Sequence, residues 1–152
     1  MFKKVCIIGC GLIGSSLARA IRKNGLSSKI VSSNRSDDIN KKVIELKIVD
    51  DSSSDTKKMA DGSDLIIIAT PLSSYENVIS KIKSSLKNGT ILTDVGSVKE
   101  NVISLIEKAI PENVSWISSH PIAGTEESGP EAGFSELFKN RWCILTPSKK
   151  AK

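Results

Sequence analysis

The chain alternates between short apolar runs and longer stretches in which apolar residues recur every three or four positions. The apolar runs have the length of strands, and the longer stretches have the periodicity of amphipathic helices. We expect strands at residues 3–8, 29–33, 65–69, 90–95, 114–117 and 142–146. We expect helices at 15–23, 36–47, 75–86 and 98–109, a short helix within 129–138, and a surface loop at 51–55. This alternation predicts an α/β fold with a doubly wound, mostly parallel sheet and helices on both faces.

The turn after the first predicted strand reads Gly9-Cys10-Gly11-Leu12-Ile13-Gly14, a G-x-G-x-x-G pattern between a strand and a helix. Gly9 permits the tight turn, Gly11 lets a pyrophosphate approach the backbone, and Gly14 lets the helix lie close to the strand. The free N–H groups at the helix start then hold the phosphates. We therefore predict a dinucleotide site in a Rossmann-type fold, the alternative being a tight turn that binds nothing.

Polar or glycine-rich turns also follow the other predicted strands, after Ser33, Ala69, Val95 and Ile117. In a parallel sheet these turns share one edge, and ligands of doubly wound folds bind at that edge. We expect the cofactor-binding residues to come from these turns. They are Gly9, Gly11, Leu12, Ile13, Gly14, Asn34, Arg35, Ser36, Thr70, Pro71, Gly96 and Ser97.

The end of the second predicted strand indicates which nicotinamide cofactor is preferred. An NAD-binding fold usually places an acidic residue there, about 20 residues past the glycine turn, against the ribose hydroxyls. Here the strand runs into Asn34, Arg35 and Ser36. Asn34 would not repel a 2′-phosphate, Arg35 could pair with it, and Ser36 could donate a hydrogen bond. The pattern favours NADP over NAD; alternatively, Arg35 stacks on the adenine or faces solvent, and Asn34 binds an ordinary ribose.

Composition narrows the classes of partner. The 152 residues suffice for one domain, and the net charge is +5. Aromatic residues make up only 4% and the lysines are scattered, so we expect no nucleic acid partner. No signal peptide is visible and every apolar run is far shorter than a membrane span, so we expect no membrane partner. Cys6, Cys10 and Cys143 are odd in number and lack zinc-ligand spacing, which predicts reduced thiols, no metal and a cytoplasmic location.

The single histidine, His120, follows a predicted strand at the binding edge. Oxidation of an alcohol by hydride transfer needs a proton acceptor, and an imidazole titrates near neutral pH. Ser97, after the neighbouring strand, is placed to hydrogen-bond either the imidazole or the carboxamide of the cofactor. The alternatives are a structural histidine and a serine that caps the following helix, and the capping role can coexist with the catalytic one.

Three motifs together resemble the prephenate and arogenate dehydrogenases of tyrosine biosynthesis. They are the glycine turn at 9–14, Asp94-Val95-Gly96-Ser97-Val98-Lys99, and His120-Pro121-Ile122-Ala123-Gly124-Thr125-Glu126 with its continuation through 128–132 to Trp142. The last motif is the most specific, and the resemblance extends from Val5 to Pro147. It implies an oxidative decarboxylation, in which hydride passes to the nicotinamide, the ring carboxylate leaves as carbon dioxide and the ring becomes aromatic.

The resemblance also implies roles for single residues. The histidine that matches His120 hydrogen-bonds the substrate hydroxyl and assists its deprotonation, and the serine that matches Ser97 orients that histidine and the substrate. Thr125 and Glu126 match residues at the substrate pocket. Catalysis is therefore expected from His120 and Ser97, and substrate binding from Ser97, His120, Thr125 and Glu126.

Members of that family carry a second, helical domain that forms the dimer and grips a substrate carboxylate. We expect residues 1–147 to be the dinucleotide-binding domain and 148–152 the start of a missing dimerisation domain. The resemblance implies a homodimer of the longer protein, prephenate or arogenate as the substrate, and little turnover by these residues alone. The rival functions are another dehydrogenase, of the hydroxyacid or imine-reductase type, and a non-catalytic dinucleotide sensor.

Overall fold

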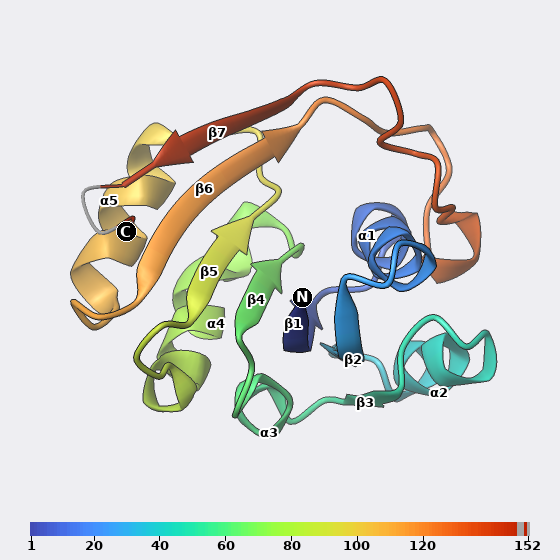
Figure 1. Ribbon diagram of the computed structural model, residues 1–152, viewed down its shortest axis with the longest axis horizontal. Helices are drawn as coiled ribbons and strands as arrows, with labels where there is room; N and C mark the ends of the chain where they lie inside the picture. The colour runs from blue at the N-terminus through green and yellow to red at the C-terminus, as the bar shows by residue number, and fades with distance from the viewer. Residues whose placement is uncertain (149–150, 152) are drawn as a thin grey trace.

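Within the residues that the structure describes, the chain folds around one sheet of seven strands in the order β3-β2-β1-β4-β5-β6-β7; Figure 1 shows this computed structural model. The structure describes residues 1–148 and 151, so most of the expected tail at 148–152 lies outside the described residues. The strands are β1 (Phe2–Ile8), β2 (Ser27–Ser33), β3 (Asp51–Ser53), β4 (Leu65–Ile68), β5 (Ile91–Asp94), β6 (Ser115–Pro121) and β7 (Cys143–Pro147). β1 to β6 run parallel, and β7 pairs with β6 in the antiparallel direction. The predicted mostly parallel sheet is confirmed.

Helices cover both faces of this sheet, which confirms the doubly wound arrangement. They are α1 (Leu12–Lys23), α2 (Asp37–Glu45), α3 (Thr56–Ala60), α4 (Tyr75–Ile82) and α5 (Glu100–Ala109), with 3₁₀ turns η1 (Leu72–Ser74), η2 (Lys83–Ser85) and η3 (Pro130–Ala132). In the part of the chain that the structure describes, no helix combines the length and the apolarity needed to cross a membrane.

The core divides into two apolar clusters, one on each face of the sheet. Val5 and Ile7 of β1 belong to the cluster that also holds apolar residues of α1 and α2. Cys6 and Ile8 belong to the cluster that holds apolar residues of α3, α4 and α5. Because successive side chains of a strand point to opposite faces, an unbroken apolar run is what a strand between two helical layers requires.

β1 lies at the centre of the sheet, between β2 and β4. The chain leaves β1 through α1 to build one side of the sheet, and later returns to the other side of β1 with β4. Ile8 pairs with Ser33 on one side and with Ile68 on the other, so the three strands end at the same level. The strand order therefore reverses at the carboxyl end of β1, where doubly wound folds form their ligand crevice.

The segment 51–55, expected to be a surface loop, instead contains β3, and this expectation is wrong. Asp51, Ser52 and Ser53 pair in parallel with the end of β2, and the Ser52 hydroxyl lies 2.7 Å from that of Ser32. Backbone and hydroxyl contacts hold this short edge strand. Its residues therefore need no apolar alternation, which is the signal from which a strand would have been predicted. The Asp55 carboxylate then accepts a hydrogen bond from the Lys58 N–H at 3.0 Å and caps the short helix α3.

Most elements begin or end within a few residues of the expected bounds; for example, α1 begins at Leu12 and α4 ends at Ile82. β6 continues beyond the expected end at 117 as far as Pro121, because its second half pairs with β7. The predicted helix at 98–109 begins only at Glu100. Within 129–138, the helical structure is limited to η3.

β6 and β7 are joined by a long segment, residues 122–142, which we call the β6–β7 excursion. In Figure 1 it leaves the sheet edge, passes over to α1, and returns as β7. The Phe134 N–H donates to the Ser16 hydroxyl of α1 at 3.1 Å. An ion pair between Lys42 and Glu131 adds a link to α2. The excursion thus connects the end of β6 with the helix that follows the glycine turn.

Candidate functional site

A cleft of about 410 Å³ lies at the carboxyl ends of β1, β2 and β4. It occupies the place where the strand order reverses, so its position is that of a nucleotide site in a doubly wound fold. Many of the residues predicted to bind the cofactor line it, namely Gly9, Gly11, Asn34, Arg35, Ser36, Thr70 and Pro71. Leu12, Ile13 and Gly14 lie in the first turn of α1 beside it, whereas Gly96 and Ser97 lie at the neighbouring β5 end.

The glycine turn has the geometry that its spacing predicts. Gly9 has φ +95°, and a Cβ on it would lie 2.8 Å from the Ala69 carbonyl oxygen. A Cβ on Gly14 would lie 2.0 Å from the Gly9 carbonyl oxygen, so only glycine lets α1 start this close to the turn. A Cβ on Gly11 would meet no atom within 4 Å. Gly11 is also the N-cap of α1 and no side chain caps the helix, which leaves first-turn N–H groups for a ligand.

Asn34 lies in the wall of the cleft with its carboxamide directed into the protein. Its Oδ1 accepts a hydrogen bond from the Cys10 N–H at 2.6 Å, and its Nδ2 donates to Asn40 Oδ1 at 3.0 Å. The side chain is buried. Asn34 therefore holds the glycine turn in place, and it does so with a neutral group where a carboxylate is usual.

The polar groups at the mouth of the cleft make fewer hydrogen bonds within the described protein. Arg35 is exposed, and its guanidinium has no hydrogen bond or ion pair with any residue that the structure describes. The Ser36 hydroxyl accepts the Ile39 N–H at 3.4 Å as the N-cap of α2, and it keeps its own proton to donate. Thr70 Oγ1 is buried without a partner among the described residues. These groups suit a polar, anionic ligand.

The thiol beside the cleft is not a nucleophile at neutral pH. Burial raises the pKa of Cys10 to about 11 and that of Cys6 to about 12. Cys143 is exposed, and none of these cysteines forms a disulfide. No group of His, Cys, Asp and Glu side chains within 1–148 and 151 is arranged to hold a metal ion.

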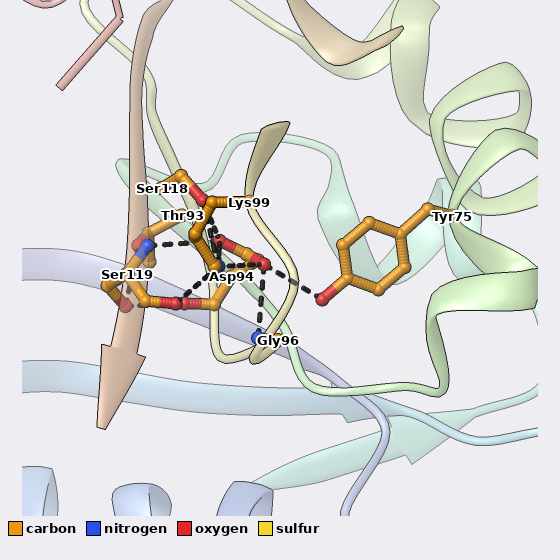
Figure 2. Close-up of polar contacts among 7 residues, drawn as sticks. All are labelled: Tyr75, Thr93, Asp94, Gly96, Lys99, Ser118 and Ser119. Carbon is orange, nitrogen blue, oxygen red and sulfur yellow. Dashed lines mark hydrogen bonds and ion pairs between the residues drawn. The ribbon is translucent and has the colours of Figure 1, made fainter. Parts of the chain in front are cut away.

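A buried polar network joins the carboxyl end of β5 to the middle of β6 (Figure 2). Asp94, fully buried, pairs with the Lys99 ammonium at 2.8 Å. Its carboxylate also accepts hydrogen bonds from the Tyr75 hydroxyl at 3.0 Å and the Ser118 hydroxyl at 2.7 Å. Burial, and next the charge of Asp94, raise the pKa of Tyr75 well above its usual value, so the phenol remains a hydrogen-bond donor.

Lys99 extends this network from β5 to β6. Its Nζ donates to the Ser118 hydroxyl at 2.9 Å and to the Ser119 carbonyl oxygen at 2.7 Å. The Gly96 N–H donates to Asp94 Oδ2 at 3.0 Å, and Figure 2 shows these groups converging on the one carboxylate. The loop that carries Ser97 is therefore fixed at both of its ends to the strand that carries His120.

Ser97 is exposed in the loop between β5 and α5. The interpretation of Ser97 as a helix cap is wrong, because α5 begins at Glu100 and the residue at its N-cap position is Lys99. His120 is half-buried and lies within β6, opposite Ile144 of β7, whereas the sequence predicted it after the strand. Since side chains alternate along a strand, His120 shares the sheet face of Ser118, which contacts the base of the Ser97 loop.

Thr125 and Glu126, the residues expected at the substrate pocket, are exposed in the first part of the β6–β7 excursion. Thr125 Oγ1 accepts a hydrogen bond from the Glu127 N–H at 3.2 Å. Neither residue lines the nucleotide cleft. Ser97 and His120 do not line the cleft either; Ser97 follows β5, and His120 lies in the second half of β6.

The motif at 94–99 is visible in the sequence, but the roles of the residues that organise this part of the site are not. These residues are Tyr75, Asp94, Lys99, Ser118 and Ser119. One signal was available: an aspartate that ends an apolar strand must be buried, and a buried carboxylate needs a charged or hydrogen-bonding partner. The partners could not be read from the sequence because they come from α4, β6 and the loop before α5.

Comparison with known proteins gives a consistent set of relatives. A family profile described as "Prephenate dehydrogenase, nucleotide-binding domain" matches residues 17–152. A cyclohexadienyl dehydrogenase of Zymomonas mobilis is 35% identical over 147 residues, covering 97% of this chain and 50% of the relative. A prephenate dehydrogenase of Lactococcus lactis is 36% identical over 146 residues, covering 95% of this chain and 41% of the relative.

Solved structures agree with these matches. The prephenate dehydrogenase of Aquifex aeolicus, in complex with hydroxyphenyl propionate and NAD+, superposes with a TM-score of 0.92 at 29% identity, covering 100% of this chain and 53% of that one. The arogenate dehydrogenase of Synechocystis superposes with a TM-score of 0.89 at 28% identity, covering 98% and 51%. The chain thus spans about half the length of the relatives that it matches.

Proposed function

The chain belongs to the prephenate dehydrogenase family, and on that premise we propose that its cleft binds a nicotinamide dinucleotide for the oxidative decarboxylation of prephenate or arogenate. The observation that carries the proposal is the glycine turn. Its first and last glycines admit no side chain, its middle glycine faces open space, and it leads into an uncapped helix start. A diphosphate fits such a turn because it needs close backbone approach and unpaired N–H groups.

Within this proposal, a bound nicotinamide would supply the acceptor for the hydride of the substrate carbon that bears the hydroxyl. The ring carboxylate leaves as carbon dioxide, and its bonding electrons complete the aromatic ring. His120 accepts a hydrogen bond from the substrate hydroxyl and assists its deprotonation, and Ser97 orients that imidazole and the substrate. Thr125 and Glu126 contribute to the substrate pocket. Because aromatisation supplies driving force, the protein mainly has to position the reacting groups.

The preference for NADP over NAD is part of the proposal. The unpaired guanidinium of Arg35 and the Ser36 hydroxyl stand where β2 ends, and the neutral Asn34 carboxamide replaces the usual acid. The relative from Aquifex aeolicus was crystallised with NAD+. We place the activity in the cytoplasm and in a homodimer of the longer protein, and we expect the 152 residues alone to show little turnover.

Calorimetric titration with NADP+ and NAD+ tests the site. Gly11→Ala should fold normally, because the added methyl meets no protein atom, yet bind both nucleotides at least about tenfold more weakly, because the methyl occupies the place of the diphosphate. Gly124→Ala is the matched control, since its methyl also meets no atom but lies outside the cleft. Unchanged affinity in Gly11→Ala would refute the proposed diphosphate site.

The same titration tests the preference. The unaltered protein should bind NADP+ more tightly than NAD+, and Arg35→Gln should lose about tenfold in affinity for NADP+ alone, since only that nucleotide carries the 2′-phosphate. Lys41→Gln, which removes a cation from the exposed side of α2, is the control for net charge. Tighter binding of NAD+ would end the NADP assignment and leave the nucleotide site intact.

A further inference from the structure

A second concave region lies away from the nucleotide cleft, between α1 and the β6–β7 excursion. Its volume is about 370 Å³, in the range of small-molecule sites. Three segments form it: the second half of α1 with Arg19, Arg22 and Lys23, then Lys47 after α2, and residues 133–136 of the excursion. None of these residues lines the nucleotide cleft. In Figure 1 the excursion comes down beside α1 at this place.

The lining carries more positive charge than the protein itself neutralises. Arg22 pairs with Asp50 at 2.8 Å, and Lys23 pairs with Glu136. The side chains of Arg19 and Lys47 have no ion pair or hydrogen bond with any part of the chain that the structure describes, and Arg19 Nε is buried without an acceptor. The Arg19 and Lys47 side chains thus line the region without a counter-charge, and an anionic ligand would supply one.

Lys47 also has an unusual backbone. Its φ is +55°, the left-handed conformation, at the residue that follows the C-cap of α2. Glycine is the usual residue at such a position because a side chain is strained there. Within the described residues, the Lys47 side chain makes no hydrogen bond or ion pair that would offset this strain.

An apolar group is held at the rim of the same cleft. Phe134 is 41% exposed, and its backbone is fixed by the hydrogen bond to the Ser16 hydroxyl. The preceding Gly133 packs against α1 so closely that a Cβ on it would lie 2.1 Å from Ser15 Oγ. Phe134 thus lines the same region as Arg19 and Lys47, the two cations that lack counter-ions.

We propose that this cleft is a second ligand site, for a small molecule that joins an oxyanion to a planar apolar group. Arg19 and Lys47 hold the phosphate or carboxylate, and the apolar group packs on Phe134. The proposal rests on the lining residues and is independent of what the nucleotide cleft binds.

Phenyl phosphate, titrated into the 15N-labelled protein and followed by NMR, tests the site residue by residue. We expect saturable shifts at the Ser135 and Glu136 amides and at the Arg19 Nε–H, and weaker binding of inorganic phosphate, which lacks the ring. Phenylacetate in a parallel titration distinguishes a carboxylate ligand from a phosphate ligand. Shifts confined to the glycine turn, or shifts that do not saturate, would overturn the proposal.

Lys47→Gly separates binding from folding. Glycine relieves the left-handed backbone, so the variant should melt at the same temperature or higher, while its affinity for phenyl phosphate falls about tenfold. Arg19→Gln should weaken binding to a similar extent. Lys57→Gln removes one charge from α3, on the opposite face of the sheet, and should leave affinity unchanged. Equal losses in Lys57→Gln and Lys47→Gly, or no loss in Lys47→Gly, would refute the site.

Discussion

At the scale of single residues, the Asp94–Lys99 pair is a buried ion pair whose two members are not equivalent. The Asp94 carboxylate is fully buried, whereas 17% of the Lys99 side chain is exposed. Lys99→Met leaves a buried carboxylate without its counter-ion, and such a loss costs about 3–5 kcal/mol. We expect a fall of that size in the free energy of unfolding, measured by urea denaturation.

Adding Asp94→Asn to Lys99→Met should restore part of the lost stability, because the uncompensated charge is then gone as well. Lys108→Met, on the exposed side of α5, is the control and should change stability by less than about 0.5 kcal/mol. If the double variant is no more stable than Lys99→Met, the ion pair is not what holds this end of the sheet together.

The buried thiols make stability depend on alkaline pH. Burial raises the pKa of Cys10 from 9.0 to about 11, so the thiol stays protonated in the native protein while it ionises in the unfolded chain. The contribution of the Cys10 thiol to the free energy of unfolding is fully present below pH 9 and is lost as the pH rises toward 11. The free energy of unfolding should therefore fall by up to about 1.4 kcal/mol per pH unit for each such thiol.

Denaturation at pH values from 8 to about 10 measures this slope. Cys10→Ala should make it shallower, with the rest of the thiol contribution coming from Cys6. Cys143→Ala is the control, because it removes a thiol that lies outside the core. If the slope is the same in Cys10→Ala and in the unaltered protein, the Cys10 thiol does not cause the pH dependence.

At the scale of elements, the sequence predicts best where the cause of a structure is local. The glycine turn is such a case, because a tight turn and a close helix start exclude side chains whatever the rest of the chain does. β3 is the opposite case, because its polar residues become a strand only through pairing with β2. The second half of β6 likewise exists because β7 returns to pair with it.

The contact between the β6–β7 excursion and α1 depends on Gly133. Its backbone is ordinary, with φ −69°, so only space is at issue. In Gly133→Ala the new methyl would overlap Ser15 Oγ and approach the Ser16 N–H to 3.0 Å, so the excursion must move away from α1. Overpacking of this kind typically costs 1–3 kcal/mol, and we expect about that loss in chemical denaturation together with faster proteolysis within 122–142.

Gly124→Ala tests whether this effect is steric. It places the same methyl in the same excursion but in open space, and it should leave both stability and proteolysis unchanged. Ser15→Ala combined with Gly133→Ala should recover part of the loss because the closest atom is removed. Equal behaviour of the two glycine variants would show that the contact with α1 does not hold the excursion.

At the scale of the whole molecule, the sheet edge at which the site lies could be predicted from the sequence, whereas the separation of that edge into two parts could not. Parallel strands alternating with helices bring every strand end to one edge, so a site there follows from the pattern alone. The structure separates that edge into the nucleotide cleft and the Asp94–Lys99 network, with His120 and Ser97 beside the latter. This division depends on side-chain contacts between α4, β5 and β6, which have no sequence signature.

The last strand of the sheet has a surface that the described chain does not cover. β7 is an edge strand, and around it Trp142 is 83%, Ile144 53% and Leu145 62% exposed. Exposed apolar edge strands favour pairing between chains. We therefore expect the 152-residue chain to self-associate as its concentration rises, and Leu145→Lys to reduce this association, in sedimentation velocity runs with a thiol reductant, since Cys143 is also exposed.

Leu26→Lys is the matched control, because Leu26 is 49% exposed but precedes β2, away from the edge. If association required only apolar surface of any kind, both lysine variants would reduce it equally. If association requires the β7 edge, only Leu145→Lys will reduce it. A lysine there places a charge on the strand that a second chain would have to approach. A protein that remains monomeric at every concentration would show that the edge, although apolar, does not associate.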